Sequence, residues 1–391
     1  MQRKRKSGYR NIFRKVVSDM KKRCIAAALA LTLVMSMTAC GAGESAAAAA
    51  ETVEAQETAA ETEVPSEAAE EAEGEEAPEE TPGENGQPGG GPGGQGGPGG
   101  QGGPGGGGGV DKSSDTELQA MITEVAPKFE LRTFEDEETG TSLQYQLYVP
   151  ENYESTQNYP LLQFIPDSSV VGKGTDAVLT QGWGGLVFAT EEEQAKHPSF
   201  IVIPVFTETV VNDNAEHSEQ VDVAVRLIQS LTEEYSIDTD RIYTTGQSMG
   251  GMTSFYQNIA YPDLFAASFF VGSQWDNSQL GVLEDKSFFY IVSAGDPRAS
   301  EGQAGLMEVF DSDGTSYSHA EWSAQDDAET QNAAVASMLE EGNDANFVTF
   351  TAGTTVADGT VSNSMAGEHM TSFDYAYKIE AVRDWLYAQS K

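Results

Sequence analysis

One stretch, residues 240–251, constrains the fold of this chain more than any other part of its sequence. Within it, residues 242–245 form a short β-branched and aromatic run of the kind that makes a buried strand. The chain then passes through Gly246-Gln-Ser-Met-Gly250, which fits the pattern G-x-S-x-G, into an apolar segment able to form a helix. A sharp strand-to-helix turn crowds the backbone beside its central residue, so glycines two positions before and after Ser248 suit it. The pattern predicts that the Ser248 hydroxyl lies at the tip of this turn as a nucleophile; a glycine-rich turn with an incidental serine is the alternative.

The candidate base is a histidine. A serine hydroxyl is a poor nucleophile unless a base contacts it and an acid orients that base. Of the four histidines, His369 lies after the last predicted strand and before the last predicted helix, where such a base is expected. His197 and His217 precede the serine, and His319 lies in an acidic, hydroxyl-rich stretch between predicted helices. We take His369 as the base; a surface histidine near a helix start is the alternative.

The candidate acid is Asp296. It follows the predicted strand over residues 288–293 in Ser293-Ala-Gly-Asp-Pro297, on a tight turn at the C-terminal edge of that strand. Asp276, one predicted strand earlier, is the rival, with Asp311 and Asp313 as further alternatives. We expect the Asp296 carboxylate to orient the imidazole of His369.

An oxyanion hole requires two backbone N–H groups aimed at the developing negative charge. One is expected from Met249, which follows the nucleophile at the start of the predicted helix. The other is expected from the loop after the predicted strand at residues 159–166, where Ser168 is the first candidate and Ser169 the second.

The first 40 residues have the pattern of an export signal. Ten of the 22 Lys and Arg residues lie in the first 23 positions, before an apolar run over residues 25–37 that is short for a permanent transmembrane helix. Met37-Thr-Ala-Cys40 then ends the run with small residues before a cysteine. This arrangement resembles a bacterial lipoprotein signal with its lipobox, which implies that Cys40 is lipidated. An ordinary signal peptide or an uncleaved anchor is the alternative.

Composition separates the rest of the chain into unlike parts. Residues 41–110 are low in complexity, first rich in Ala and Glu and then in Gly, Pro and Gln, so we predict a disordered linker. The only cysteines are Cys24 and Cys40, so the remainder offers no disulfide and no thiol chemistry. After residue 40, 12 basic residues face 61 acidic ones, which disfavours nucleic acid and anionic lipid surfaces as partners.

Residues 111–391 have the length of one α/β domain. Two alternating segments, 129–134 and 142–148, flank the turn Glu137-Glu-Thr-Gly140 and predict an antiparallel hairpin. Denser apolar runs predict strands at residues 159–166, 200–206, 242–245, 265–271, 288–293 and 347–351. Helices are predicted at residues 115–126, 221–235, 301–310, 326–341 and 373–388, with a polar helical segment within 179–198. This alternation predicts an α/β fold with a mostly parallel central sheet and helices on both faces.

Other motifs indicate less. Asp311-Ser-Asp-Gly314 is similar to the start of a calcium loop but lacks the later ligands, so a solvated loop is expected. Trp183 and Trp275 could each line a pocket, although core packing would account for them equally well. No cysteine or histidine pair has metal spacing, so we expect neither a metal ion nor another cofactor.

Six motifs, the serine motif among them, occur together between about residues 129 and 388. They are Tyr159-Pro-Leu-Leu162, Gln194-Ala-Lys-His-Pro198, Tyr235-Ser-Ile-Asp-Thr-Asp-Arg-Ile-Tyr243, Gly246-Gln-Ser-Met-Gly-Gly251, Tyr261-Pro-Asp-Leu-Phe-Ala266 and Arg383-Asp-Trp-Leu386. In this combination the chain resembles the predicted-peptidase and esterase branch of the α/β-hydrolases, relatives of polyhydroxybutyrate depolymerases and of feruloyl or acetyl-xylan esterases. The resemblance implies the α/β-hydrolase fold and a triad of Ser248, Asp296 and His369. The chain departs from it at Pro166-Asp-Ser-Ser169, where His-Gly and small residues are usual, and in a longer, polar stretch over residues 311–344.

We therefore expect an extracellular serine hydrolase, in the first place a carboxylic ester hydrolase, that forms an acyl-enzyme on Ser248. We expect it to be held at the membrane of a bacterium, of Gram-positive type, through the lipid on Cys40 alone. Its substrate would be a small-molecule ester or an ester carried on a polysaccharide. Two alternatives stay open: a serine peptidase or acyl-peptide hydrolase with the same triad, and an inactive surface binding protein on a hydrolase scaffold.

Overall fold

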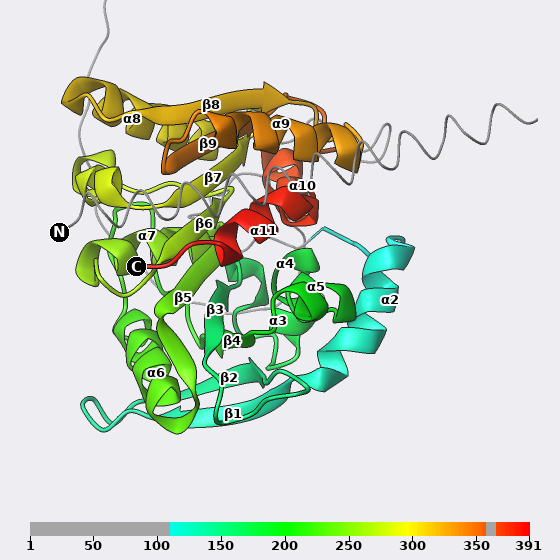
Figure 1. The fold of residues 1–391 in the computed structure, drawn as a ribbon, viewed down its shortest axis with the longest axis vertical. Helices are drawn as coiled ribbons and strands as arrows, with labels where there is room; N and C mark the ends of the chain where they lie inside the picture. Colours follow the sequence, from blue (N-terminus) through cyan, green and yellow to red (C-terminus); the bar gives the residue numbers. More distant parts are fainter. Residues whose placement is uncertain (1–109, 357–364) are drawn as a thin grey trace, which may run out of the picture. The chain divides into compact units, whose positions relative to one another are not determined.

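The computed structural model describes residues 110–356 and 365–391 (Figure 1). The predicted signal peptide with Cys40, and the predicted linker up to residue 109, lie outside the described residues. Among the helices within them, none combines the length and the apolar character that crossing a membrane requires.

A mixed sheet of nine strands forms the centre of the described domain (Figure 1). The strands are β1 (Glu130–Glu135), β2 (Ser142–Tyr148), β3 (Tyr159–Ile165), β4 (Phe200–Val205), β5 (Ile237–Gln247), β6 (Ala267–Val271), β7 (Phe288–Ser293), β8 (Tyr317–Trp322) and β9 (Ala345–Phe350). Their order across the sheet is β1-β2-β4-β3-β5-β6-β7-β9-β8. The β1–β2 and β2–β4 pairs are antiparallel, and all pairs from β4 to β8 are parallel. The predicted fold class, including the N-terminal antiparallel hairpin, is confirmed.

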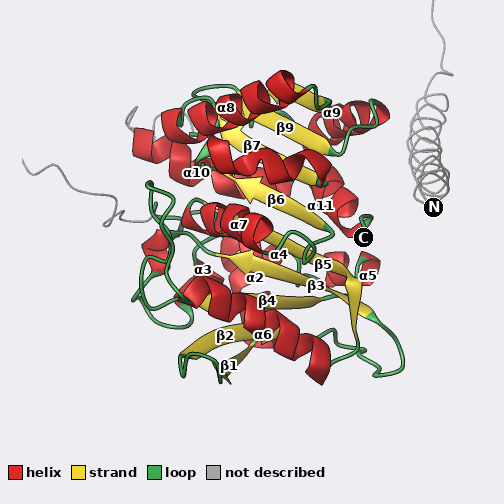
Figure 2. Ribbon diagram, turned by 90° about the vertical axis from the view of Figure 1, so that its left-hand side faces the viewer, coloured by secondary structure: helices red, strands yellow, loops and turns green. Residues whose placement is uncertain are grey.

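Helices cover both faces of the sheet (Figure 2). They are α2 (Thr116–Val125), α3 (Ala177–Thr180), α4 (Trp183–Val187), α5 (Glu191–Lys196), α6 (Gln220–Glu234), α7 (Met249–Ala260), α8 (Pro297–Asp313), α9 (Ala328–Glu340), α10 (Met365–Lys378) and α11 (Glu380–Tyr387), with 3₁₀ segments η1 (Ala126–Lys128), η2 (Ser168–Val170) and η3 (Asn277–Asp285). On one face α6, α7, α8 and η3 share an apolar cluster with the sheet. On the other face α2, α4, α9, α10 and α11 share a second cluster.

The strand sequences follow from this two-sided cover. β3, β6 and β7 are buried at every position, which favours the mostly apolar runs seen in the sequence. β1, at the edge of the sheet, has no fully buried residue and is mostly polar. In α6 the buried residues Val221, Ala224, Ile228 and Leu231 repeat at intervals of three and four, and burying each large one contributes about 1.5–3 kcal/mol.

The structure corrects three expectations for the C-terminal half. Residues 317–322 form the edge strand β8, which the sequence did not reveal because its residues are polar and half exposed. The predicted solvated loop at Asp311-Ser-Asp-Gly314 is wrong: the first three residues end α8, and Gly314 terminates it in the left-handed conformation at φ 77°. The helix predicted over residues 373–388 is two helices, α10 and α11, separated at Ile379.

Candidate active site

Ser248 lies on a sharp turn between β5 and α7. Its φ of 51° is unusual for a residue other than glycine, and its N–H is held by the Val271 carbonyl at 3.0 Å. A Cβ on Gly246 would overlap the backbone of Gly250, and a Cβ on Gly250 would overlap the carbonyl of Ile165. The two glycines are therefore required by close backbone approach, as the sequence pattern predicts.

Three side chains far apart in the sequence meet at this turn. His369 Nε2 lies 2.9 Å from Ser248 Oγ, and His369 Nδ1 lies 2.5 Å from Asp296 Oδ2. Asp296 is buried, whereas the imidazole remains partly exposed. Because Asp296 follows β7 and Ser248 follows β5, both lie at the carboxyl edge of the parallel strands, where α/β sheets place their reactive groups. The geometry is that of a base held between a hydroxyl and an orienting carboxylate.

The histidine occupies a helix rather than the expected loop. His369 lies in the first half of α10, and its carbonyl accepts a hydrogen bond from Ser372 Oγ at 2.9 Å. Its ring packs edge-on against Phe373 with centroids 5.0 Å apart. Phe373 in turn lies against Gly272, where a Cβ would overlap the phenyl ring. These contacts fix the plane of the imidazole.

Asp296 is also fixed by its own helix. It caps α8, with its Oδ1 accepting the N–H of Ala299 at 3.4 Å, so one oxygen serves the helix and the other serves His369. Tyr290 lies on β7 and is completely buried; burial and, second, the charge of Asp296 raise its pKa well above the ordinary value. The Tyr290 phenol therefore stays neutral near Asp296.

Each of the two predicted oxyanion donors begins a helical segment. Met249 begins α7, and Ser168 begins η2, and no group in the described residues accepts the N–H of either one. The N–H of Ser169, the second candidate, already donates to Asp167 Oδ1 at 2.7 Å. The other oxygen of Asp167 accepts from Gln247 Nε2 at 2.7 Å, so a buried carboxylate ties this loop to the residue before Ser248.

The rival titratable residues have other partners. Asp276 caps η3, and hydrogen bonds from Ser278 and Gln279 lower its pKa.

The other histidines also have partners elsewhere. His217 stacks on Tyr256 with centroids 3.8 Å apart, and His319 Nε2 on β8 lies 3.1 Å from Thr349 Oγ1. Asp311 and Asp313 belong to the last turn of α8. The structure brings none of these candidates into the Ser248–His369–Asp296 hydrogen-bond chain.

The two tryptophans pack rather than frame a described cavity. Trp275 is buried in the cluster that contains α7, and its ring lies 6.3 Å from that of Tyr256. Trp183 is half buried at the start of α4, with Lys378 Nζ 4.3 Å from the centre of its ring.

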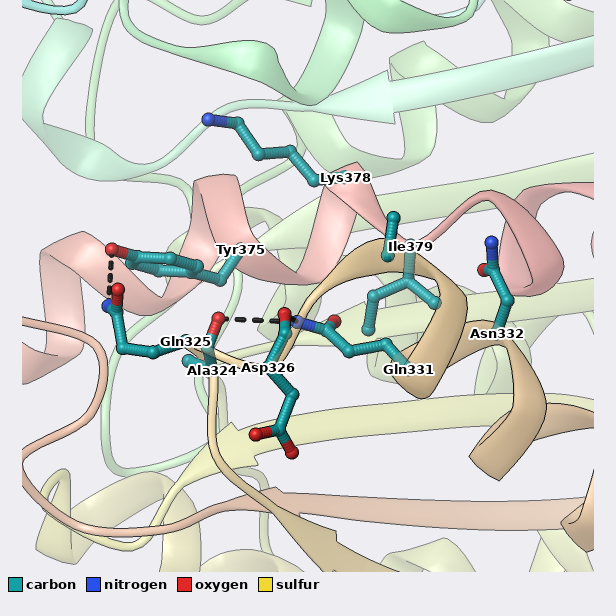
Figure 3. A pocket seen from close by; sticks show the side chains of 9 residues that line it. Ala324, Gln325, Asp326, Gln331, Asn332, Tyr375, Lys378 and Ile379 are labelled. Atoms are coloured by element: carbon teal, nitrogen blue, oxygen red, sulfur yellow. Dashed lines mark hydrogen bonds between the residues drawn. The ribbon is translucent and has the colours of Figure 1, made fainter. Parts of the chain in front are cut away.

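A polar cavity of about 230 Å³ lies between the first turns of α9 and the second half of α10 (Figure 3). Gln325 bonds the Tyr375 hydroxyl across its rim at 2.7 Å, and Gln331 donates to the Ala324 carbonyl at 3.2 Å. A smaller cavity of about 160 Å³ lies beside His197 and Tyr387. Ser248, Asp296 and His369 line neither of these two cavities.

One trio in the described residues has metal-ligand character, which sequence spacing did not reveal. Ligand atoms of Glu193, His197 and Asp384 lie within 4.8 Å of one another. However, Arg383 Nε donates a hydrogen bond to Glu193 Oε1 at 2.8 Å, and Arg383 Nη2 forms an ion pair with the same oxygen at 2.6 Å. Lys196 also interacts electrostatically with Glu193 and Asp384. These cations already compensate the negative charge, and a divalent ion would be repelled by them.

Sequence reasoning also missed Glu368. Its Oε2 accepts hydrogen bonds from Ser293 Oγ at 2.8 Å and from the Gly353 N–H at 2.9 Å. The only sequence signals for it are its position directly before His369 and a glycine directly before Asp296.

No protein-family model and no curated protein matches the sequence. Solved structures do match it. The chain is similar to a thermostable esterase with a TM-score of 0.54 and 24% identity, over 68% of this chain and 64% of the esterase. The fold is that of the α/β-hydrolases. The chain thus spans slightly less than two thirds of the length of that esterase.

Two feruloyl esterases match the chain more distantly. The feruloyl esterase module from Clostridium thermocellum, solved with sinapinate, has a TM-score of 0.41 and 10% identity over 65% of this chain and 88% of its own. The CE1 ferulic acid esterase from the fungus Anaeromyces mucronatus has a TM-score of 0.38 and 13% identity over 64% of this chain and 91% of its own.

Proposed function

We propose that the chain is a serine hydrolase that cleaves carboxylic esters. The observation that supports this most directly is the hydrogen-bond chain from Ser248 Oγ to His369 Nε2 and from His369 Nδ1 to Asp296 Oδ2, at 2.9 and 2.5 Å. It lies on a strained strand-to-helix turn whose glycines permit no side chain. A hydroxyl, a base and an orienting acid in this order form the arrangement that activates a serine for acyl transfer.

In the first half-reaction, Ser248 Oγ attacks the ester carbonyl carbon while its proton passes to His369 Nε2. The carbonyl oxygen becomes an oxyanion, and the imidazolium is stabilised by Asp296, which remains ionised. When the tetrahedral intermediate collapses, the C–O bond to the alcohol breaks, and His369 returns the proton to the departing alkoxide. An acyl-enzyme ester on Ser248 is left.

In the second half-reaction, water replaces the alcohol. His369 Nε2 accepts a proton from the water, whose oxygen attacks the acyl carbon of the ester on Ser248. Collapse of this intermediate breaks the bond to Ser248 Oγ, which recovers its proton from His369. The carboxylic acid leaves and the free enzyme is restored.

The oxyanion would be stabilised by the N–H groups of Met249 and Ser168. Met249 is at the N-terminus of α7, where the unpaired N–H groups and the helix dipole favour negative charge. Loss of one such donor costs about 100- to 1000-fold in rate. The Asp167–Gln247 hydrogen bond keeps the loop that carries Ser168 beside the nucleophile, despite the absence of the usual His-Gly.

We place the enzyme outside the cell, at the membrane of a bacterium of Gram-positive type, on the lipobox pattern that ends at Cys40. The low-complexity segment over residues 41–110 would then separate the hydrolase domain from the lipid. Small-molecule esters and esters carried on polysaccharides are the substrates to which such a location gives access.

The test is hydrolysis of a chromogenic short-chain ester by the full chain and by Ser248→Ala. We expect turnover in the wild type and its loss in Ser248→Ala. Ser337→Ala, which removes an exposed hydroxyl from α9, is the matched control and should retain full turnover. Turnover that persists unchanged in Ser248→Ala would remove this mechanism.

A substrate panel then defines the ester. Short acyl esters, acetylated xylan and feruloylated sugars differ in acyl group and carrier, and peptide amides test the peptidase alternative. Faster cleavage of amides than of matched esters would assign a peptidase. No turnover of any member, together with no fluorophosphonate labelling, would assign an inactive binding protein.

A further inference from the structure

A second carboxylate, that of Glu368, lies beside the turn that carries Asp296. Glu368 Oε2 accepts a hydrogen bond from Ser293 Oγ at 2.8 Å and another from the Gly353 N–H at 2.9 Å. Ser293 ends β7, and Gly353 lies in the loop that follows β9. One side chain from α10 therefore joins the end of β7 to the loop after β9 at the carboxyl edge of the sheet.

The bonded serine organises the acid turn itself. Ser293 Oγ accepts the N–H of Gly295 at 3.2 Å while it donates to Glu368. The Ser293 carbonyl accepts the N–H of Asp296 at 3.0 Å. The turn that presents the Asp296 carboxylate is thus closed through Ser293, and Glu368 fixes the orientation of the Ser293 hydroxyl.

Gly295 shows how closely Glu368 approaches this turn. A Cβ placed on Gly295 would overlap the carboxyl carbon and both carboxyl oxygens of Glu368. The carboxylate therefore packs directly on the backbone one residue before Asp296. Because Glu368 also directly precedes His369, its side chain holds the acid turn while its backbone carries the base.

We propose that Glu368 is a positioning residue that sets the distance between Asp296 and His369. Resting on the proposed serine-hydrolase function, this inference assigns to Glu368 no contact with the substrate. Without its carboxylate, the Asp296 turn and α10 lose their shared anchor, and the 2.5 Å contact between Asp296 Oδ2 and His369 Nδ1 lengthens. Misplacement of a reacting group by about 1 Å costs on the order of 100-fold in rate.

The kinetic test compares Glu368→Ala with the conservative Glu368→Gln in the full chain. We expect kcat for a short-chain ester to fall about 100-fold in Glu368→Ala with KM within about twofold, because the substrate site is untouched. Glu368→Gln keeps an oxygen that can accept both hydrogen bonds, so it should retain kcat within about threefold. An unchanged kcat in Glu368→Ala would overturn the proposal.

A double variant tests the packing directly. Gly295→Ala places a methyl group where the carboxylate lies, so we expect it to reduce kcat about as much as Glu368→Ala does. Glu368→Ala makes room for that methyl group, and the double variant should be no slower than Glu368→Ala alone. Losses that multiply in the double variant would show that the two positions act independently, and would contradict the proposal.

A spectroscopic measurement separates this inference from the proposed function. A strong imidazole–carboxylate hydrogen bond gives the His369 Nδ1 proton a far-downfield NMR signal in the free enzyme, assigned by its absence in His369→Ala. We expect the signal to persist in Glu368→Gln and to shift or vanish in Glu368→Ala, with thermal unfolding unchanged within a few degrees. A wild type with this response but without hydrolytic turnover would contradict the proposed function alone. An identical signal in wild type and Glu368→Ala would contradict the positioning role.

Discussion

Two histidine–aspartate pairs in the described residues are joined by a hydrogen bond, and they differ in what surrounds them. His369 and Asp296 lie at the carboxyl edge of the parallel strands, and His197 and Asp384 lie near the amino end of β4, on α5's C-cap and α11. The two imidazoles are similarly exposed, 26% for His369 and 22% for His197. The two carboxylates differ in exposure: the Asp296 side chain is 6% exposed and that of Asp384 is 35% exposed.

The two histidines differ more in what their Nε2 atoms contact. His369 presents Nε2 to the Ser248 hydroxyl, whereas His197 uses Nε2 for Asp384 and stacks its ring on Tyr387 with centroids 4.7 Å apart. A histidine–aspartate contact alone therefore indicates neither a base nor a reaction. A base for catalysis also needs a nucleophile at Nε2 and a buried acid at Nδ1.

The largest expected effect separates the two histidines. His369→Ala should reduce kcat for a short-chain ester about a millionfold, because base and acid functions are lost together. His197→Ala, the matched control, should change kcat less than about twofold. Steady-state assays of both purified variants measure kcat. Comparable losses of kcat in the two variants would contradict the claim that only His369 is the base.

The acids should differ in the same direction. Asp296→Asn removes the charge that stabilises the imidazolium and disturbs the tautomer of His369, so we expect a loss of about 10⁴-fold in kcat. Asp384→Asn should leave kcat unchanged. Equal activity of Asp296→Asn and wild type would assign the orienting role to another group.

Stability should show the reverse order. Glu193 beside His197 is buried and paired with Arg383, so Arg383→Ala leaves a buried carboxylate without its hydrogen-bonded cation. We expect the free energy of unfolding to fall by about 3–5 kcal/mol. His369→Ala, by contrast, should change it by less than about 1 kcal/mol. Urea unfolding followed by circular dichroism measures both, and a more stable Arg383→Ala would contradict the ion-pair description.

The smallest effect concerns pH. Burial alone would raise the pKa of Asp384. The hydrogen bond and charge of His197, together with the charges of Lys196 and Arg383, lower it by more than burial raises it. The folded-state pKa of Asp384 therefore lies below its ordinary value. Its contribution to stability is therefore present above about pH 4 and is lost as the pH falls through the folded-state pKa. Asp384→Asn should lower Tm by about 2 °C at pH 7, and the difference from wild type should shrink below about pH 4. A difference in Tm that grows on acidification would show that folding raises the pKa of Asp384, and would contradict the account.

The sequence predicted the first pair and missed the second for a physical reason. Ser248 stands in a backbone pattern that few other folds require, and the glycines beside it record contacts that a Cβ would prevent. The order of strands and helices then limits where the acid and base lie. His197 and Asp384 have no such local signature, because their contact joins α5 to α11 across 187 positions of the chain.

The same limit explains the other differences. β8 is polar because an edge strand has a solvated side, so its residues resemble a loop. Glu368 carries no motif, since its proposed role depends on the end of β7 and the loop after β9, which only the folded chain brings together. The oxyanion donors are backbone groups and leave no side-chain signal.

The most direct test of the central claim is fluorophosphonate labelling of the full chain, followed by intact mass and peptide mapping. We predict one adduct on Ser248 in the wild type and in His197→Ala, and none at this position in Ser248→Ala or His369→Ala. An adduct on another residue, or equal labelling of wild type and His369→Ala, would contradict the account.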